Sequence, residues 1–490
     1  MTARGALAPV TLATLLTGKP PGRSVPAAEV ADLARSSQRV LVVLDDDPTG
    51  TQSVADLPVL MTWTPESLEW ALRRGAPAVY VMTNSRSLSA ADAELRNREV
   101  ARAAFEAAAA AGIRVDFVSR SDSTLRGHFP LETDTLAEEV LAATGRTVDG
   151  IVVIPAFGDA GRITIDAVHY AGNPTDGYTP VGETEFARDA TFGYTSSDLR
   201  EWVAEKTAKS ARGGRRLDAA DVAWIDLRTL RTDPEGAVRI LRSLHDAQPV
   251  VADIVDENDL RLLAVALYAA EAQGSRLIYR VGPPFGRAVI GQEVTAPLEP
   301  SDIARIREGG LAQDATGGLI VVGSHVSMTT KQLARLVERT APAQLELDVA
   351  TILTDGGATH VADIASRAAE ALATGNVVVG TSRTLVRTED PDESLDIARR
   401  VSTAVVDVVR QVLAARPPRF VVAKGGITSS DVAARGLSIE RAMVRGPMLP
   451  GIVSLWEPMD GPARGIPYVV FAGNVGGPES LADVVDKLSA

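Results

Sequence analysis

Three consecutive carboxylates follow an apolar segment near the N-terminus. Residues 40–44 (VLVVL) lead directly into Asp45, Asp46 and Asp47, and a nearby proline and glycine favour a tight turn. Ligands of open α/β sheets bind beyond the carboxyl ends of the strands, which is where this turn would lie. Neighbouring carboxylates repel one another unless a cation, a proton or an arginine compensates them. A capped, solvated turn would have the same composition, but three carboxylates in a row favour a functional site.

A second polar cluster, rich in arginine, follows another predicted strand. Arg120, Asp122, Ser123 and Arg126 occur in close succession after residues 114–119. A guanidinium group offers a planar pair of donors that matches a carboxylate, so Arg120 and Arg126 are candidates to hold an anionic substrate. A surface loop of salt bridges is the alternative interpretation.

Three glycine- and hydroxyl-rich segments follow apolar runs in the C-terminal part of the chain. They cover residues 323–327 (GSHVS), 425–429 (GGITS) and 473–477 (GNVGG). Small residues between a strand and a helix N-terminus leave backbone N–H groups free to hold an anion. Each segment alone would be an ordinary strand-to-helix turn. Three of them in one part of the chain indicate a site for nucleotide phosphates.

Several classes of function are disfavoured by what the sequence lacks. It contains no Walker loop, no G-x-G-x-x-G fingerprint, no H-E-x-x-H and no G-x-S-x-G. The absence of cysteine excludes disulfides and thiolate chemistry. A net charge of −13 disfavours nucleic acid and anionic membranes, and no apolar run reaches the roughly 20 residues that a bilayer requires. We therefore expect a cytoplasmic protein with no nucleic-acid or membrane partner.

Short apolar runs alternate with amphipathic stretches along the chain, as in βα units. Apolar residues make up 45% and aromatic residues only 4%, which is typical of parallel sheets covered by helices. The pattern predicts two α/β domains with largely parallel sheets facing a central cleft. We expect a loosely ordered extension over residues 1–38, a first domain over 39–290, a connection over 291–318 and a second domain over 319–490.

Strands are predicted directly before each polar cluster. They cover residues 39–44, 78–82 and 114–119 in the first domain, and 319–322, 419–423 and 468–472 in the second. Residues 164–189, rich in glycine, proline and threonine, interrupt the alternation and are predicted to form loops with at most a hairpin.

In this order, the motifs resemble those of the four-carbon acid sugar kinase family. The family's D-D-x-T-G turn and K-x-D-S-T-x-R-G segment are matched by residues 46–50 and 120–127. Its second-domain elements G-S-x-S-x-x-T-x-x-Q, G-G-[DE]-T-S, P-G and G-N-F-G correspond to residues 323–332, 425–429, 450–451 and 473–476. The similarity runs from about Val40 to the C-terminus. Six motifs in one order make coincidence improbable.

The resemblance implies an ATP-dependent kinase, with Mg²⁺ on the phosphates, that phosphorylates a hydroxyl of a small C4 or branched sugar acid. In this family the first domain binds the sugar acid and the second binds the nucleotide. Asp46 and Asp47 would be catalytic. The residues expected to face the substrate are Asp46, Asp47, Arg120, Asp122, Ser123 and Arg126. Those expected to face the nucleotide are Ser324, Ser327, Gly425, Gly426, Ile427, Thr428, Gly473 and Gly476.

The sequence departs from the family pattern at three of these motifs. Arg120 replaces a lysine, Ile427 replaces the acid of the G-G-[DE]-T-S loop, and Val475 replaces a phenylalanine. Two other functions stay open. One is an oxidoreductase that uses a nucleotide cofactor on a hydroxy acid, which the missing dinucleotide fingerprint disfavours. The other is a non-catalytic sensor, in which Ile427 would reflect lost chemistry. A homodimer is the default expectation for assembly.

Overall fold

The computed structural model describes residues 8–209, 216–382 and 391–490. The chain forms two compact units: the first contains the described residues of Met1–Gly50 and Trp63–Val294, and the second contains Thr51–Thr62 and the described residues of Thr295–Ala490. Both units are α/β, as the sequence predicted. The cleft expected between the two domains stays a prediction. Residues 51–62 differ from the expected division, because they belong to the second unit.

The first unit is built on a parallel sheet with the strand order β3-β1-β4-β11-β5-β10-β9. In the β1–β4 pair, Asp45 lies opposite Arg120, so the two polar clusters of the sequence emerge side by side. The strands are β1 (Arg39–Asp45), β3 (Ala78–Met82), β4 (Arg114–Arg120), β5 (Gly150–Ile154), β9 (Ala223–Ile225), β10 (Gln248–Ala252) and β11 (Leu277–Val281).

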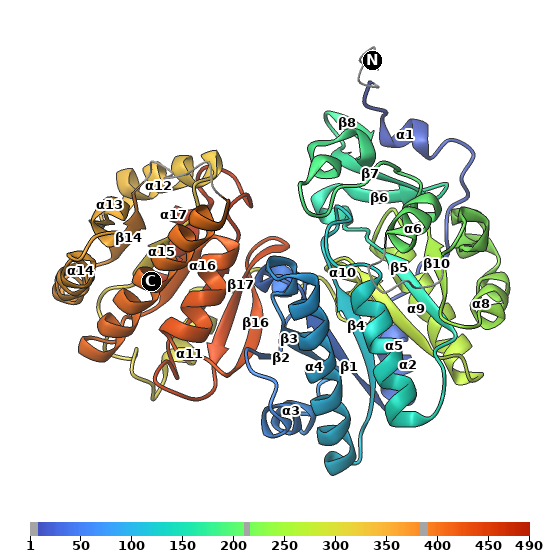
Figure 1. The fold of residues 1–490 in the computed structure, drawn as a ribbon, viewed down its shortest axis with the longest axis horizontal. Coiled ribbons are helices and arrows are strands. Elements are labelled where there is room, and N and C mark those ends of the chain that lie inside the picture. Colours follow the sequence, from blue (N-terminus) through green and yellow to red (C-terminus); the bar gives the residue numbers. More distant parts are fainter. Residues whose placement is uncertain (1–7, 210–215, 383–390) are drawn as a thin grey trace. The chain divides into compact units, whose positions relative to one another are not determined.

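Helices cover this sheet, and all seven residues of β1 are buried. One group of contacting helices is α3 (Pro65–Leu72), α4 (Ala90–Ala111) and α5 (Leu131–Thr144). Figure 1 shows α4 and α5 in front of β1 and β4. The other group is α2 (Ala27–Ser37), α7 (Leu227–Thr232), α8 (Pro234–Ser243), α9 (Glu257–Ala272) and α10 (Pro284–Val289).

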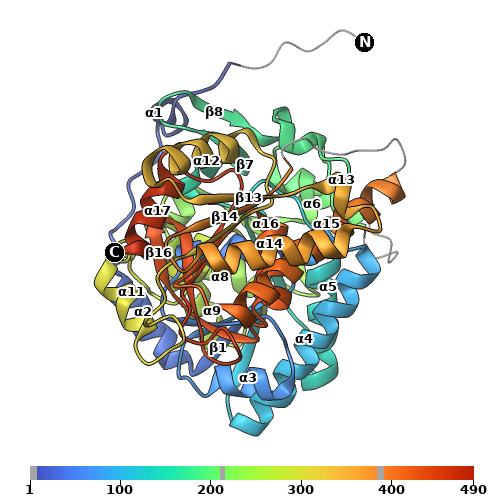
Figure 2. The same ribbon diagram turned by 90° about the vertical axis from the view of Figure 1, so that its left-hand side faces the viewer.

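A small three-stranded antiparallel sheet lies where the sequence predicted loops with at most a hairpin. Its strands are β6 (Arg162–Ile165), β7 (Val168–Asn173) and β8 (Gly177–Pro180), and α6 (Leu199–Ala208) follows it in the chain. Leucines of and next to α1 (Leu12–Leu15) pack against its buried core, and Figures 1 and 2 show α1 beside β8. Glycine and proline are depleted in strands, which explains why the sequence pattern of this region did not indicate them.

The N-terminal segment differs from the loosely ordered extension expected for residues 1–38. Its α2 packs on α9 and α10, and Val25, Ala27 and Val30 are buried. Gly291 comes so close to α2 that a Cβ atom there would lie 2.1 Å from the Ala31 nitrogen. Val25, Ala27 and Val30 therefore belong to the core of the first unit.

The second unit contains a mixed sheet with the order β13-β14-β12-β15-β18-β17-β16-β2. The first five strands are parallel, and β17, β16 and β2 continue the sheet in antiparallel pairs. The strands are β2 (Leu57–Leu60), β12 (Leu319–Val322), β13 (Ala343–Leu347), β14 (Val377–Thr381), β15 (Val421–Lys424), β16 (Arg441–Leu449), β17 (Ile452–Pro458) and β18 (Tyr468–Phe471).

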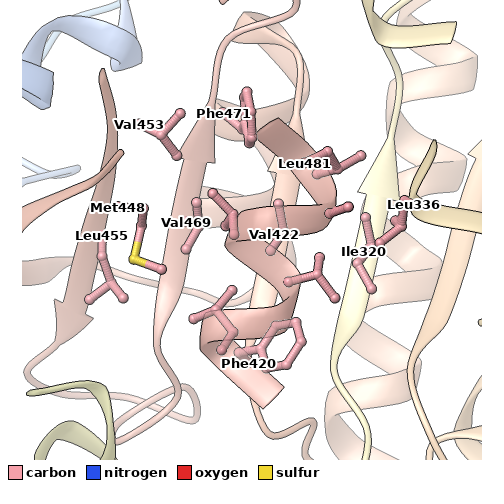
Figure 3. Close-up of a cluster of buried hydrophobic side chains, with 14 of the residues drawn as sticks. Ile320, Leu336, Phe420, Val422, Met448, Val453, Leu455, Val469, Phe471 and Leu481 are labelled. Carbon is pink, nitrogen blue, oxygen red and sulfur yellow. The ribbon is translucent and has the colours of Figure 1, made fainter. Parts of the chain in front are cut away.

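Helices of the second unit pack in two groups. In one, α17 (Ser480–Ser489) contacts α11 (Pro300–Arg307) and α12 (Ser327–Thr340). In the other, α15 (Pro391–Ala415) contacts α13 (Val349–Ile352), α14 (Gly357–Ala371) and α16 (Gly426–Asp431), and Figure 2 shows α14 beside α15. Figure 3 shows the core between the strands and α17, where Leu481, Val422 and Val469 gather.

Candidate active site

The acidic turn and the arginine loop meet at the carboxyl ends of β1 and β4. Arg120 Nη1 lies 2.9 Å from Asp45 Oδ1 and 3.0 Å from Asp46 Oδ1. All three side chains are buried, so their charges interact with little screening by water. Two carboxylates thus share one arginine nitrogen inside the protein.

The acidic turn requires a glycine at position 50. The short helix η1 (Pro48–Ser53) returns the chain over the carboxylates. A Cβ atom at Gly50 would lie 1.9 Å from Asp45 Oδ2 and 2.5 Å from Arg120 Cζ. Any larger residue would displace the buried ion pair.

The two buried carboxyl groups have raised pKa values. Burial raises the pKa of Asp45 to about 8, although Arg120 opposes this shift. Burial also raises the pKa of Asp46, but Arg86 and Arg120 limit the increase to about 6. In both residues Oδ2 is buried without a hydrogen-bond partner among the described residues.

Arg86, which the sequence analysis missed, connects the carboxylates of both clusters. It lies in η2 (Ser85–Ser87), directly after β3, and forms ion pairs with Asp47, with Asp122 at 3.6 Å and with Asp46 at 3.9 Å. Its side chain is partly exposed, at 20%. The strand before it was predicted, so the rule that sites lie at carboxyl ends could have identified it.

Asp47 differs from its two neighbours because both of its oxygens are engaged. Oδ1 accepts a hydrogen bond from the backbone nitrogen of Thr49 at 2.9 Å, and Oδ2 pairs with Arg86. Burial acts to raise the pKa of Asp47, but Arg86, Arg120 and Thr49 outweigh it, so the pKa is lowered.

The arginine loop is held in a strained conformation against the acidic turn. Arg126 Nε donates to Asp122 Oδ2 at 2.6 Å, and Leu125 between them is buried with a left-handed φ of 71°. A Cβ atom on Gly127 would lie 3.3 Å from Asp46 Oδ2. Such backbone strain persists only where the surroundings fix it, and it concentrates at functional sites.

Asp122 and Ser123 contribute differently to this loop. Burial acts to raise the pKa of Asp122, but Arg86 and Arg126 hold it well below the usual value. Ser123 is buried, and its carbonyl oxygen contacts His169 Nε2 at 2.8 Å. The structure thus brings Asp46, Asp122 and Arg126 of the predicted residues into one charged cluster with Arg86.

Arg280, in the middle of the apolar strand β11, was also missed. It is fully buried, donates from Nη2 to the Arg126 carbonyl oxygen at 3.1 Å and lies over the Trp202 ring. Its Nε and Nη1 have no hydrogen-bond partner among the described residues. Burial lowers the pKa of Arg280, although Asp46 and Asp122 act in the opposite direction.

The second unit brings its three glycine-rich loops together at the ends of β12, β15 and β18, which are neighbours in the sheet. A Cβ atom on Gly323 would lie 2.1 Å from Thr428 Oγ1, and one on Gly473 would lie 2.5 Å from Ser324 Oγ. Only glycine allows the loops to approach this closely.

Side-chain hydrogen bonds from α12 fix the loop after β18. Thr329 Oγ1 donates to the Gly473 carbonyl oxygen at 2.9 Å, and Gln332 Nε2 donates to the carbonyl oxygens of Val475 and Gly477, each at 2.9 Å. These hydrogen bonds hold the loop against α12.

The remaining predicted nucleotide residues lie on the same loops. Ser327 begins α12 and Gly426 begins α16. Gly425 and Gly476 adopt φ values of 128° and 83°, which favour glycine. Ile427, at the position of the family's acid, is 70% exposed.

Lys424 is a buried cation directly before these glycines. Its Nζ donates to the Ala472 carbonyl oxygen at 2.6 Å and lies 3.8 Å from the centre of the Phe471 ring. Burial lowers the pKa of Lys424 to about 7. The sequence analysis gave this residue no role.

The described residues lack both a metal-binding cluster and a membrane-spanning helix. No group of three or more histidine, aspartate or glutamate side chains is arranged to hold a metal ion there. Within the same ranges, no helix is both long and apolar enough to cross a membrane.

Comparison with known families divides the chain as the structure does, except that residues 51–62 lie within the first family domain but in the second unit. A family model for a sugar-binding N-terminal domain matches residues 41–289, and one for a nucleotide-binding C-terminal domain matches residues 319–481. No protein of curated function matches the chain at a significant level. The acidic and arginine-rich cluster thus lies in a sugar-binding domain, and the glycine-rich loops lie in a nucleotide-binding domain.

Two solved structures share the fold, and a third matches over a similar length with a lower TM-score. A Haemophilus influenzae protein from a family of unknown function is 16% identical, with a TM-score of 0.60, over 91% of this chain and 100% of its own. A Salmonella typhimurium LT2 protein, proposed to be a tRNA synthase, is 18% identical, with a TM-score of 0.62, over 90% and 98%. A Bordetella bronchiseptica protein, crystallised as a domain-swapped dimer with citrate, is 24% identical, with a TM-score of 0.36, over 91% and 98%.

Proposed function

The chain belongs to the four-carbon acid sugar kinase family, and from this premise we propose that it transfers the γ-phosphoryl group of ATP to a hydroxyl of a small sugar acid. Phosphoryl transfer requires positioning of the two reactants, neutralisation of phosphate charge and orientation of the attacking hydroxyl. The geometry of the first unit supports an assignment of the residue that orients the attacking hydroxyl.

The observation that carries the proposal is the difference between Asp45, Asp46 and Asp47. A pKa of about 8 keeps Asp45 protonated at neutral pH, and Asp47 has both oxygens engaged and a lowered pKa. Asp46 alone combines a pKa of about 6 with an oxygen that lacks a hydrogen-bond partner. A general base is most effective when its pKa lies near the working pH. We therefore assign Asp46 as the base and Asp47 as the residue that holds Arg86.

The same geometry revises the expected holder of the substrate carboxylate. Arg120 is buried and occupied by Asp45 and Asp46. The side chains of Arg86 and Arg126 are partly exposed, at 20% and 32%. Because a guanidinium can bind a carboxylate through two parallel hydrogen bonds, we propose that Arg86 and Arg126 hold the acid group. Arg120 would instead keep Asp46 in position.

The glycine-rich loops of the second unit would hold the nucleotide phosphates through backbone N–H groups. These loops contain no carboxylate, so the side-chain oxygens that could face Mg²⁺ there are neutral, such as the hydroxyls of Ser324 and Thr428 and the amide oxygen of Asn474. Such a donor set fits Mg²⁺, which is commonly carried by phosphates and water with few protein ligands. When bound, the ion supplies charge neutralisation on the phosphates. In its protonated form, Lys424 would add a positive charge beside the loops; burial lowers its pKa to about 7.

ADP release with a panel of C4 and branched sugar acids, in both hydroxy and oxo forms, tests the proposal. We expect ATP- and Mg²⁺-dependent ADP formation that one acid stimulates well above the ATPase background. Saturable binding of an acid without ADP formation would favour a sensor. Reduction of NAD⁺ by a hydroxy acid would favour an oxidoreductase. Either result would overturn the kinase assignment.

The pH dependence of kcat/KM should show an acid limb near pH 6. A base must be ionised to accept a proton, so activity is lost as the pH falls through the pKa of Asp46 and is constant above it. Initial rates at subsaturating sugar acid, measured from pH 5 to 8 with ATP saturating, test this. A profile that is flat across pH 6 would contradict the assignment of Asp46.

Two glycines of the loop after β18 should respond very differently to substitution by alanine. Gly473→Ala places a methyl group 2.5 Å from Ser324 Oγ, so the loops must separate. We expect the KM for ATP to rise about tenfold or more, because the backbone donors lose their positions. Gly477→Ala is the matched control, because no atom lies within 4 Å of its added Cβ. Equal effects of the two variants on the KM for ATP would contradict the proposed cradle.

A further inference from the structure

A cavity of about 420 Å³ lies in the first unit, away from the candidate active site. It is bounded by the amino ends of β4 and β11 and by the ends of α4, α5 and α9. Strand β4 runs from Arg114, at the cavity, to Arg120, at the acidic turn. At a rise of about 3.3 Å per residue, the cavity lies about 20 Å from the acidic turn. Small-molecule sites commonly measure about 300–1,000 Å³, so the cavity is large enough for a ligand.

Three arginines surround this cavity. Arg114, Arg146 and Arg276 each follow the end of a helix and line the cavity wall. Within the described ranges Arg146 and Arg276 form no ion pair, and Arg114 has only a 3.6 Å contact with Asp116. Burial, followed by repulsion from Arg146, lowers the pKa of Arg276. The chain as a whole carries a charge of −13, so a cluster of three arginines does not follow from its composition.

The two carboxylates of the cavity do not cancel this positive charge. Asp116 and Glu271 both pair with Arg39, at 3.1 and 2.8 Å, and the Arg39 side chain is only 1% exposed. The buried Arg39 therefore neutralises much of the negative charge of Asp116 and Glu271. The net charge that faces the cavity is positive.

The remaining wall is apolar. Phe105 and Phe117 pack edge to face with their ring centres 5.2 Å apart, and Val140 and Ile278 also line the cavity. An apolar wall beside cationic groups matches a ligand that has an apolar body and an anionic group.

We propose that this cavity is a second binding site, for a small organic anion whose aromatic or branched apolar body carries a carboxylate or a phosphate. The site is independent of the phosphoryl-transfer machinery. The apolar body of this ligand distinguishes it from the polar sugar acids proposed for the active site.

Isothermal titration of the full-length protein with 2-naphthoate, 2-naphthyl phosphate and the neutral 2-naphthamide tests the proposal without any mutation. At least one of the two anions should bind saturably at millimolar concentration or below. The amide should bind about tenfold or more weakly, because it lacks the charge that the guanidinium groups recognise. Whichever anion binds more tightly identifies the preferred acid group. Equal affinity for the amide, or no saturable binding of either anion, would overturn the proposal.

Variants then identify the residues responsible. Arg146→Ala and Arg276→Ala should each weaken naphthoate binding about tenfold and leave sugar-acid kinetics unchanged. Arg242→Ala is the control, because Arg242 is an exposed arginine in the last turn of another helix of this unit. The alternative role of these arginines is to stabilise the C-terminal ends of the preceding helices through the helix dipole. In that case both variants would lower the melting temperature and leave naphthoate affinity unchanged, which would also overturn the proposal.

Discussion

Asp46→Asn should lower kcat by about 10²–10⁴-fold, the usual contribution of a general base. The substitution keeps the shape of the side chain and the oxygen that accepts from Arg120 at 3.0 Å. It removes the carboxylate oxygen that has no hydrogen-bond partner and that would accept the substrate proton. Steady-state ADP formation under saturating ATP and sugar acid measures the effect. The acid limb of the pH profile should disappear with the same substitution.

Asp45→Asn is the matched control, because it changes an adjacent buried carboxyl group in the same way. Burial raises the pKa of Asp45 to about 8, so an asparagine resembles the protonated form that exists at neutral pH. Its oxygen can still accept from Arg120. We expect kcat to change by no more than a few fold. If Asp45→Asn were as inactive as Asp46→Asn, or if Asp46→Asn stayed active, the assignment of the base would be wrong.

The location of these carboxylates could be predicted because strand and turn are encoded locally. An apolar run ending in Asp45 is followed by proline and glycine, and the parallel strand pattern places its end beside that of β4. What the local pattern could not provide is the ionisation of each carboxyl group. Asp45, Asp46 and Asp47 are identical in type and adjacent in sequence. Their pKa values differ because Arg86 and Arg120 approach them from other strands.

The residues that the sequence analysis missed share a physical reason. Arg280 stands within an apolar strand, and its role depends on Arg126 and Trp202, which are distant in sequence. The strands β16 and β17 were missed for a similar reason. Their hairpin turns at Gly451, with a φ of 68°, but β16 also pairs with β2, which lies almost 400 residues earlier. Contacts of this kind are set by the tertiary fold and leave no periodic signal.

Arg86→Ala should raise the KM for the sugar acid about 10- to 100-fold, because a hydrogen bond to a charged group contributes about 1.5–3 kcal/mol. The KM for ATP should stay nearly constant, since Arg86 lies in the sugar-binding domain. Arg86→Lys keeps the charge but loses the planar pair of donors, so we expect it to recover only part of the affinity. Binding of the acid by calorimetry in the absence of ATP separates this effect from catalysis.

The pH profile of the Arg86 variants distinguishes a role in the site from a merely structural one. Burial raises the pKa of Asp46, and Arg86 is the strongest of the groups that oppose this increase. Removing its positive charge should therefore raise the pKa further and move the acid limb of kcat/KM to higher pH. Arg86→Lys retains a positive charge and should leave the limb near pH 6. If Arg86 only stabilised the fold, Arg86→Ala would lower the melting temperature and leave the limb in place. If the acid limb of kcat/KM did not move, Arg86 would not influence the pKa of Asp46, even if the variant bound the sugar acid poorly.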